Sequence, residues 1–395
     1  MAEHKTHEML VVPGDSSCVR NSEGDIIVLR DDRLLLGWTE FQKAEGEDWS
    51  PSRFSGRISQ DGGITWSEPF CFLEGEGKNG VMEVNFQRMP SGDIALFYLV
   101  KNSLADYRLT MRRSADEGQS WGEPKRLSDW TGYVGGTNAR SIVTSSGRVV
   151  LPFAYGILPW GKSPGYSVSQ VFYSDDDGQT WHLSRPPLGA PGSASGCGEP
   201  AVVELSDGRL LMMMRNTTGR IWQSISDDGG ARWEPAEPTE LATSASPISL
   251  RRFPDSNDIL VIWNQASTRE IEWGFVRNRL SCAISADDCR TWCHFKNLES
   301  LDDVTHVEPA PVGEAPERRK PIWVAPIVPA GLLNCSYPSC TFFKDTVVIS
   351  YDVPATYCAL KLRVLPIAWF YDDDAASFLS VERGGTVEWM PRAQG

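Results

Sequence analysis

Short runs of apolar residues, separated by turn-forming residues, recur along the whole chain. The clearest of these runs span 25–29, 33–38, 93–98, 148–153, 209–214 and 258–263. Several follow a pair such as Ser91-Gly92 or Asp207-Gly208, which is typical of a tight hairpin turn. A brief apolar run bounded by turn residues is typical of a buried strand. The pattern therefore predicts many short strands joined by hairpins.

An eight-residue motif of the form Ser-x-Asp-x-Gly-x-Ser/Thr-Trp lies between these runs. Its five copies occupy 59–66, 114–121, 174–181, 226–233 and 285–292. The fourth copy has Arg232 at the Ser/Thr position, and the fifth has Cys289 in place of Gly. The Asp carboxylate can accept backbone N–H groups, the Gly can take a positive φ, and the Trp can pack beneath the turn. The motif is therefore predicted to be structural, with no role in catalysis.

The spacing of the copies predicts the architecture. They begin at Ser59, Ser114, Ser174, Ser226 and Ser285, so successive copies are 55, 60, 52 and 59 residues apart. One four-stranded propeller blade needs about this length. The 103 residues after Trp292 can finish the fifth blade and add one blade without the motif, but not two. We expect an all-β, six-bladed β-propeller with four-stranded antiparallel blades, formed as a single domain by residues 1–395.

Composition agrees with this fold and narrows the choice of ligand. The 35 Gly and 26 Pro residues favour many turns over long helices, and the 41% hydrophobic content is enough for an extended core. A net charge of −14 argues against nucleic acid or an anionic membrane as partner, because both select a basic surface. An anionic ligand is expected only where arginines are concentrated locally.

The first residues and the Cys and His residues bear on location and on metal binding. Residues 1–8 show no basic segment followed by an apolar one, and no apolar run approaches membrane-spanning length. We therefore expect a cytoplasmic protein. The nine Cys lack a CxxC pair and the five His are scattered, which favours free buried thiols over a zinc site or a Ser-His-Asp triad. We expect neither metal nor cofactor.

The repeated motif, known as the Asp-box, resembles that of the sialidase (neuraminidase) superfamily in repeat order over nearly the whole chain. Related propellers also include glycan-binding and lyase members, so the fold alone does not fix the function. The resemblance implies an acidic sugar whose carboxylate is held by three Arg guanidinium groups. It also implies an order along the chain: an early Arg, an acid Asp, a Glu, two further Arg and a late Tyr.

The strongest local match covers 198–216, which reads Gly-Glu-Pro-Ala-Val-Val-Glu-Leu-Ser-Asp-Gly-Arg-Leu-Leu-Met-Met-Met-Arg-Asn. It is similar to the family's Glu-x-x-Val-Val-Glu-Leu-x-Asp-Gly-x-Leu-x-x-x-x-Arg. A tight hairpin at Asp207-Gly208 returns the chain to its origin, so Glu199 and Arg215 should lie at the same end of the blade. The resemblance implies Glu199 as a catalytic base and Arg215 as a ligand of the substrate carboxylate.

Two further positions fall before the first box. Arg20 precedes the run at 25–29, where the family has its first Arg, although the next two residues differ from the usual Ile-Pro. An arginine that pairs with Glu23 at the surface is the alternative. Asp48 lies in a polar loop where the family places its general acid, which must be protonated to act. Glu47, or an ordinary solvated loop acid at Asp48, is the alternative there.

Of the remaining two positions, one lies before the fifth box and the other after it. Arg279 is preferred to Arg277 as the third arginine, because it stands next to Leu280 as in the family. Tyr337 precedes the run at 346–351 and resembles the family's late Tyr, which implies that it is the nucleophile. A half-buried structural aromatic is the alternative.

These positions together imply an exo-sialidase-like retaining glycoside hydrolase for a terminal sialic acid or a related acidic sugar. A neutral phenol can approach the substrate carboxylate, whereas an attacking carboxylate would be repelled by it. A glycan-binding propeller without catalysis is one alternative. A hydrolase or lyase for another acidic sugar, such as a uronic acid, is the second. Asn85, Tyr133 and Arg140 are further candidates to line the same mouth.

Overall fold

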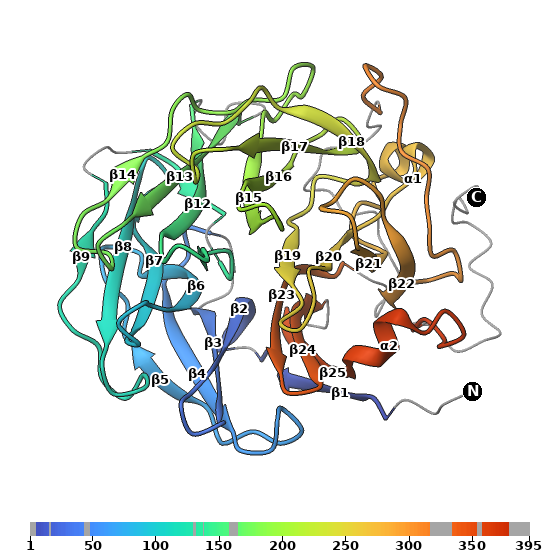
Figure 1. The fold of residues 1–395 in the computed structure, drawn as a ribbon. Coiled ribbons are helices and arrows are strands. Elements are labelled where there is room, and N and C mark those ends of the chain that lie inside the picture. Colours follow the sequence, from blue (N-terminus) through green and yellow to red (C-terminus); the bar gives the residue numbers. More distant parts are fainter. Residues whose placement is uncertain are drawn as a thin grey trace.

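The computed structural model describes residues 5–15, 17–42, 48–128, 132–136, 138–157, 165–316, 334–353 and 358–378. Across these ranges the chain forms 25 strands and two short helices. The strands make six antiparallel sheets that stand around a common centre (Figure 1). The predicted all-β, six-bladed propeller is thus confirmed.

The first three blades are built as follows, from the centre outward. Blade one contains β2 (Cys18–Val28), β3 (Leu34–Gln42), β4 (Ser52–Ser59) and β5 (Phe70–Leu73). Blade two contains β6 (Val81–Arg88), β7 (Ile94–Ser103), β8 (Asp106–Ser114) and β9 (Lys125–Arg126). Blade three has an inner strand in two pieces, β10 (Val134–Gly135) and β11 (Ile142–Val143), then β12 (Val149–Gly156), β13 (Ser167–Ser174) and β14 (His182–Leu183).

The last three blades include the two helices. Blade four contains β15 (Gly198–Glu204), β16 (Leu210–Arg215), β17 (Arg220–Ser226) and β18 (Glu237–Ala242). Blade five contains β19 (Ser249–Arg252), β20 (Ile259–Asn264), β21 (Leu280–Ser285) and β22 (Cys293–Glu299), with α1 (Thr268–Trp273) between β20 and β21. Blade six contains β23 (Ser336–Phe343), β24 (Thr346–Val353), β25 (Ala359–Pro366) and β1 (His7–Val12), and α2 (Ile367–Tyr371) follows β25.

The ring closes through strands from distant parts of the chain. The N-terminal strand β1 is the outer strand of blade six, whose other strands come from the C-terminal part. On the inside, β23 of blade six packs against β2 of blade one. The sixth blade carries no box, as predicted, and these contacts make it the blade that joins both ends of the chain.

Apolar layers between neighbouring blades form the core. Leu35 of blade one and Leu96 of blade two share one layer, and each of the other neighbouring pairs of blades shares a layer of its own. A middle strand therefore buries both faces, and β20 is buried along its whole length. This explains why the chain shows continuous apolar runs and not a polar-apolar alternation.

Each box forms the turn between the third and fourth strands of its blade. In the first box, the Gly63 N–H donates to Ser59 Oγ at 2.8 Å. The Thr65 N–H and hydroxyl donate to the two Asp61 carboxylate oxygens at 2.9 and 2.6 Å. The Trp66 indole N–H donates to the Gly63 carbonyl at 3.0 Å. The same Ser and Asp contacts recur in the other four copies, which confirms the structural interpretation of the motif.

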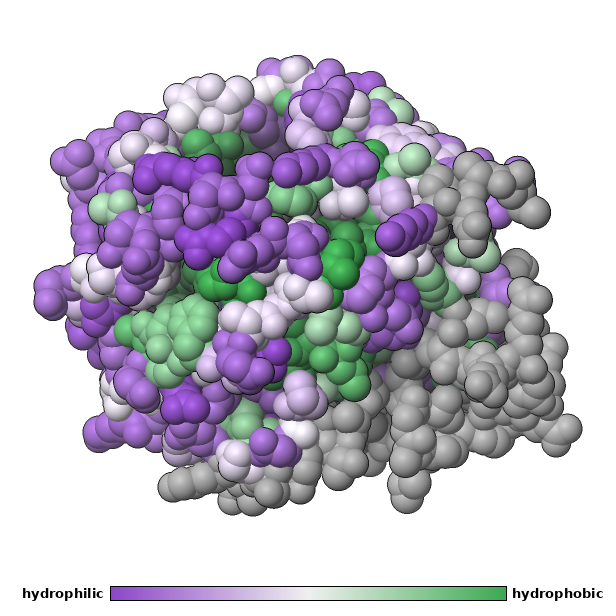
Figure 2. Space-filling view, turned by 90° about the horizontal axis from the view of Figure 1, so that it is seen from below, coloured by the Kyte–Doolittle hydropathy of each residue, from purple (hydrophilic) through white to green (hydrophobic). Residues whose placement is uncertain are grey.

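Hydrophilic side chains cover much of the face shown in Figure 2, with hydrophobic side chains in small groups between them. Such a mixed surface is ordinary for a folded chain whose apolar residues fill the layers between blades.

Among the described residues, no helix has both the length and the apolar character needed to cross a bilayer.

Replacing Asp61 by Ala should lower the free energy of unfolding by about 1–2 kcal/mol, because the Thr65 N–H and hydroxyl and the Ser59 hydroxyl lose a charged acceptor at a partly exposed turn. Hydrogen bonds from Thr65 and Ser59 hold the pKa of Asp61 below its ordinary value despite partial burial, so this stabilisation should be lost as pH falls through that pKa. Urea unfolding at neutral pH measures the change. The neighbouring exposed Gln60→Ala should stay within about 0.5 kcal/mol of wild type, and equal losses in both variants would contradict the assignment.

Candidate active site

The strand register brings the predicted site residues to one end of the blades. Cys18 at the start of β2 pairs with Gln42 at the end of β3, whereas the first box lies beyond the opposite end of the same sheet. In blade four, Gly198 pairs with Arg215, again at the end away from the box. The boxes and the candidate site therefore lie at opposite strand ends.

Equivalent β-bulges shape the inner strands of four blades. The register shifts between Ser22 and Asp25, Met82 and Asn85, Gly198 and Ala201, and Ser336 and Ser339. In each bulge one residue has a positive φ, and these residues are Glu23, Glu83, Glu199 and Tyr337. A non-glycine residue in this conformation is strained and concentrates at functional sites. The bulges thus place three carboxylates and a phenol on the four inner strands, next to the centre.

Glu199 joins blades four and six. Its Oε1 accepts the Tyr337 hydroxyl at 3.0 Å, and its Oε2 accepts Arg215 Nη1–H at 2.6 Å. Arg215 comes from the end of β16, so the hairpin brings it back beside Glu199 as the sequence predicted. Both ionic side chains are mostly buried but not closed off, with exposures of 14% for Glu199 and 15% for Arg215.

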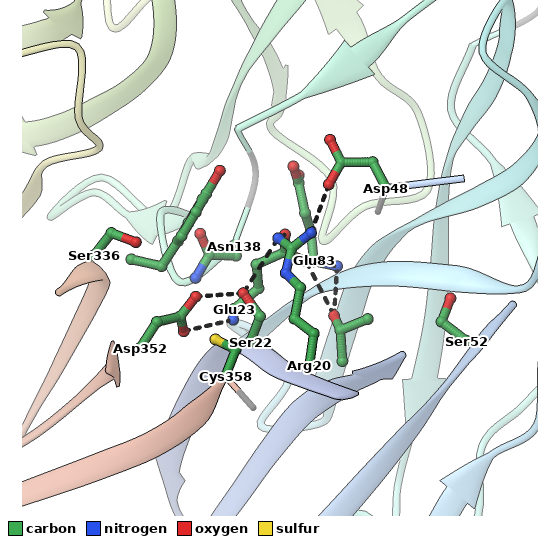
Figure 3. Close-up of polar contacts among 12 residues, drawn as sticks. Arg20, Ser22, Glu23, Asp48, Ser52, Glu83, Asn138, Ser336, Asp352 and Cys358 are labelled. Atoms are coloured by element: carbon green, nitrogen blue, oxygen red, sulfur yellow. Dashed lines mark hydrogen bonds and ion pairs between the residues drawn. The ribbon is translucent and has the colours of Figure 1, made fainter. Parts of the chain in front are cut away.

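Arg20 and Asp48 form a second pair at the centre (Figure 3). Arg20 Nη1–H donates to Asp48 Oδ1 at 2.7 Å, and Nη2–H donates to the buried Glu23 at 2.9 Å. The Tyr133 hydroxyl donates to Asp48 Oδ2 at 3.1 Å. Lys101 fixes the Asp48 backbone by donating to its carbonyl at 2.8 Å. The ion pair between Arg20 and Glu23 is therefore internal and not a surface contact. Glu47, the alternative to Asp48, lies outside the described residues.

Residues 32–349 match the family described as the BNR repeat-like domain. A sialidase of Clostridium perfringens is 30% identical over 226 residues, which cover 57% of this chain and 44% of that protein. The chain belongs to the sialidase superfamily. A sialidase of Micromonospora viridifaciens is 33% identical over 137 residues, covering 30% of this chain and 18% of its own length. The chain thus aligns with less than half the length of either relative.

Solved structures show that the superfamily fold extends over most of this chain. The sialidase of Trypanosoma rangeli in complex with sialic acid gives a TM-score of 0.65 at 16% identity, over 91% of this chain and 58% of that one. A protein of unknown function from Dyadobacter fermentans gives a TM-score of 0.68 at 17% identity, over 92% of this chain and 99% of that one. At such identities the likeness concerns the fold alone.

In this sialidase-superfamily propeller, the local charges set the protonation of the three central groups. Burial would raise the pKa of Glu199, but the guanidinium groups of Arg215 and Arg140 outweigh it and hold the pKa below its ordinary value. Burial would also raise the pKa of Asp48, but the neighbouring charges and hydrogen bonds, led by those of Arg20, outweigh it and hold the pKa below its ordinary value. Burial and the charge of Glu199 raise the pKa of Tyr337 above its ordinary value. The free protein therefore carries two carboxylates and a neutral phenol.

Arg277 lies at the centre, and Arg279 does not. Arg277 stands over the Tyr337 ring, with 5.6 Å from its guanidinium carbon to the ring centroid, and donates to Ser336 Oγ at 3.0 Å. Arg279 is only 3% exposed and binds Glu270 of α1 at 3.0 Å and Asp302 at 2.7 Å. The sequence-based preference for Arg279 does not fit this geometry, because both of its guanidinium ends are occupied by structural carboxylates.

The structure adds two carboxylates that the sequence did not indicate as site residues, Glu23 and Glu83 in the bulges of β2 and β6. Tyr133, a candidate to line the mouth, touches Asp48 directly. Aligning the inner strands of the blades on one another would have revealed the first two, because Glu23, Glu83, Glu199 and Tyr337 hold the same bulge position. Asn85 accepts the Ser141 hydroxyl at 2.5 Å and so ties blade two to blade three.

The two arginines should differ sharply in their effect on stability. Arg279→Met leaves two carboxylates without their shared cation and should cost about 3–5 kcal/mol of unfolding free energy. Arg277→Met removes a partly exposed side chain with one neutral hydrogen bond, and should cost about 1 kcal/mol or less. Denaturant unfolding of both variants at neutral pH makes the comparison. Similar losses for the two would refute the separation into structural and site arginines.

Proposed function

We propose that this propeller is a retaining exo-glycosidase that releases a terminal sialic acid, or a related acidic sugar, from a glycan. The observation that carries the proposal is the Tyr337–Glu199 hydrogen bond, set beside Arg215 and Arg277 at the centre of the ring. A phenol paired with an ionised carboxylate can act as a nucleophile with its own base. The superfamily relationship adds the acidic sugar as the substrate class.

Arg20, Arg215 and Arg277 are proposed to bind the sugar carboxylate. Guanidinium groups suit this role because their planar N–H donors match the two oxygens of a carboxylate. In the free protein, Arg20 holds Asp48 and Arg215 holds Glu199. Binding therefore exchanges protein carboxylates for the substrate carboxylate, while Arg277 meets the substrate with no acid of its own among the contacts described.

The proposed reaction has two steps. In the first, Tyr337 Oη bonds to the anomeric carbon as the glycosidic C–O bond breaks, Glu199 takes the phenolic proton and Asp48 protonates the leaving oxygen. In the second, Asp48 removes a proton from water, the water oxygen bonds to the anomeric carbon, and the Tyr337–carbon bond breaks. The phenolate then recovers its proton from Glu199. Two displacements at one carbon retain the configuration.

Asp48 can serve as the acid only if substrate binding changes its surroundings. Arg20 keeps Asp48 ionised in the free protein, against the effect of burial. When the substrate carboxylate draws Arg20 away and adds a negative charge, both changes favour the protonated form of Asp48. We therefore expect the acid to be formed in the complex with substrate.

A glycan-binding propeller without catalysis is the second candidate. The observation that favours it is the same Arg20–Asp48 ion pair, because it satisfies the acid and the first arginine within the protein. A third possibility retains the chemistry but changes the sugar, since a uronic acid would present its carboxylate to the same arginines. These alternatives predict different results with matched substrates.

Tyr337→Phe should lower kcat/KM on a fluorogenic sialoside by about a thousandfold or more, because the nucleophile is removed while the arginines remain. A uronide with the same leaving group, assayed in parallel, identifies the sugar. Binding of the free sugar acid, measured by calorimetry, should be largely kept in the variant. Full activity of Tyr337→Phe would falsify the nucleophile, and sugar binding without turnover by wild type across pH would support the binding propeller.

A further inference from the structure

Asn138 and Arg140 carry buried donors with no acceptor among the described residues. Ten buried side-chain polar atoms in the described residues have no hydrogen-bond partner, and three of them are Asn138 Nδ2, Arg140 Nε and Arg140 Nη2. Both side chains are only 1% exposed. An unsatisfied buried donor is unfavourable, more so on a charged group. Such a cluster needs a reason, and its location supplies one.

The two residues lie where the inner strand of blade three is interrupted. β10 ends at Gly135 and β11 begins at Ile142, and both pieces pair with β12. After β10, the Gly136 N–H donates to Glu83 Oε1 at 2.8 Å. A Cβ on Gly136, whose φ is +81°, would stand 2.5 Å from Glu199 Cα. The break in the strand thus brings this segment into contact with the backbone of the proposed base.

One edge of the Arg140 guanidinium is unoccupied by any described residue. Its Nη1–H donates to the carbonyl and to the Oδ1 of Asn138 at 2.8 and 2.7 Å. The Nε–Nη2 edge is the one that binds a carboxylate side-on. Arg148 uses that edge in this protein, donating to the two Asp175 oxygens at 2.7 and 2.8 Å. Arg140 therefore presents a carboxylate-binding edge that holds no carboxylate from the part of the chain that the structure describes.

Glu199 lies against the segment that leads to Arg140, and its charge acts on Arg140 more strongly than that of Glu83. Burial lowers the pKa of Arg140, and the negative charge of Glu199 opposes this effect more than that of Glu83 does. Conversely, the charge of Arg140 lowers the pKa of Glu199 less than that of Arg215 and more than that of Arg277. Other charged or titratable groups near this pair are Tyr337, which hydrogen-bonds Glu199, and Arg251, which donates to the Ala139 carbonyl at 2.5 Å. Asp25 is a third: burial raises its pKa to about 7, and the charges of Arg251 and Arg140 oppose that rise.

We propose that Arg140 is a positioning residue that holds the Glu199 carboxylate once the substrate carboxylate has taken Arg215. The inference rests on the proposed function, in which Arg215 changes partner on binding. Glu199 Oε2 then loses its 2.6 Å contact with Arg215, and the Nε–Nη2 edge of Arg140 receives it. Oε1 keeps its hydrogen bond to Tyr337, so the base stays ionised and oriented. Arg140 itself touches neither the substrate nor the reacting atoms.

A double-mutant cycle tests the proposal without any substrate, because Arg215→Met imitates the loss of Arg215. The readout is the pH titration of the Glu199 side-chain carboxyl carbon by NMR, assigned with Glu199→Gln. Adding Arg140→Met in the Arg215→Met background should raise the Glu199 pKa by about one pH unit or more. In the wild-type background, where Arg215 still holds Glu199, the rise should be clearly smaller.

Equal rises in the two backgrounds, or no rise in either, would overturn the proposal. Arg140→Lys is the second variant, in case the methionine variant does not fold. Lysine keeps the charge but loses the planar edge, so it should recover only part of the effect. Arg148→Met removes the same kind of side-on guanidinium at the other strand end, and should leave the Glu199 titration as in wild type.

Kinetics provide the second test. The acid limb of kcat reports the enzyme–substrate complex, and that of kcat/KM reports the free enzyme. With Arg140 removed, protonation of Glu199 should move the acid limb of kcat to higher pH by more than that of kcat/KM, whereas equal displacement would contradict the role. If wild type cleaves neither sialoside nor uronide, the proposed function fails, and the carboxyl titration still decides on Arg140.

Discussion

The shared carboxylate of Glu199 is the interaction on which the site depends. It accepts Tyr337 from blade six and Arg215 from its own blade, and the segment after β10 of blade three lies against its backbone. A buried carboxylate is favourable only when cations and donors replace its water. Placing Glu199 at the centre therefore fixes where Arg215 and Tyr337 must be, and gives the neighbouring blades a common contact.

In this propeller, the elements that stabilise the fold and the residues of the candidate site lie in different places. Apolar layers between neighbouring blades bury the middle strands on both faces, and the boxes tie the outer turns at one strand end. The opposite strand ends carry the four bulges of the inner strands and the charged groups of the candidate site, which disfavour folding when considered alone. The four bulge residues with a positive φ, Glu23, Glu83, Glu199 and Tyr337, lie at that end, and the packed layers between the blades keep them in place.

Local sequence patterns were sufficient for the fold and for part of the site. The boxes set the blade period, and the hairpin at Asp207-Gly208 placed Glu199 beside Arg215, because a tight turn fixes both distance and direction. Arg277 and Arg279 could not be separated in this way. They precede β21 in an irregular segment, and their directions depend on Glu270 of α1 and on Asp302, which are remote from any motif. Arg140 could be predicted only as a candidate to line the mouth, because the role proposed for it depends on the break between β10 and β11.

The proposed mechanism requires Tyr337 to form a covalent bond with an acidic sugar. The test incubates the protein with a 2,3-difluorinated sialic acid and then locates the added mass by peptide mass spectrometry. The fluoride on the anomeric carbon is a good leaving group, so Tyr337 Oη can displace it, and the second fluorine slows hydrolysis of the glycosyl–enzyme by disfavouring its oxocarbenium-like transition state. We expect one sugar on the peptide that contains Tyr337, and none on the Tyr337→Phe variant. Turnover of a sialoside with no adduct, or with the adduct on another residue, would contradict the mechanism.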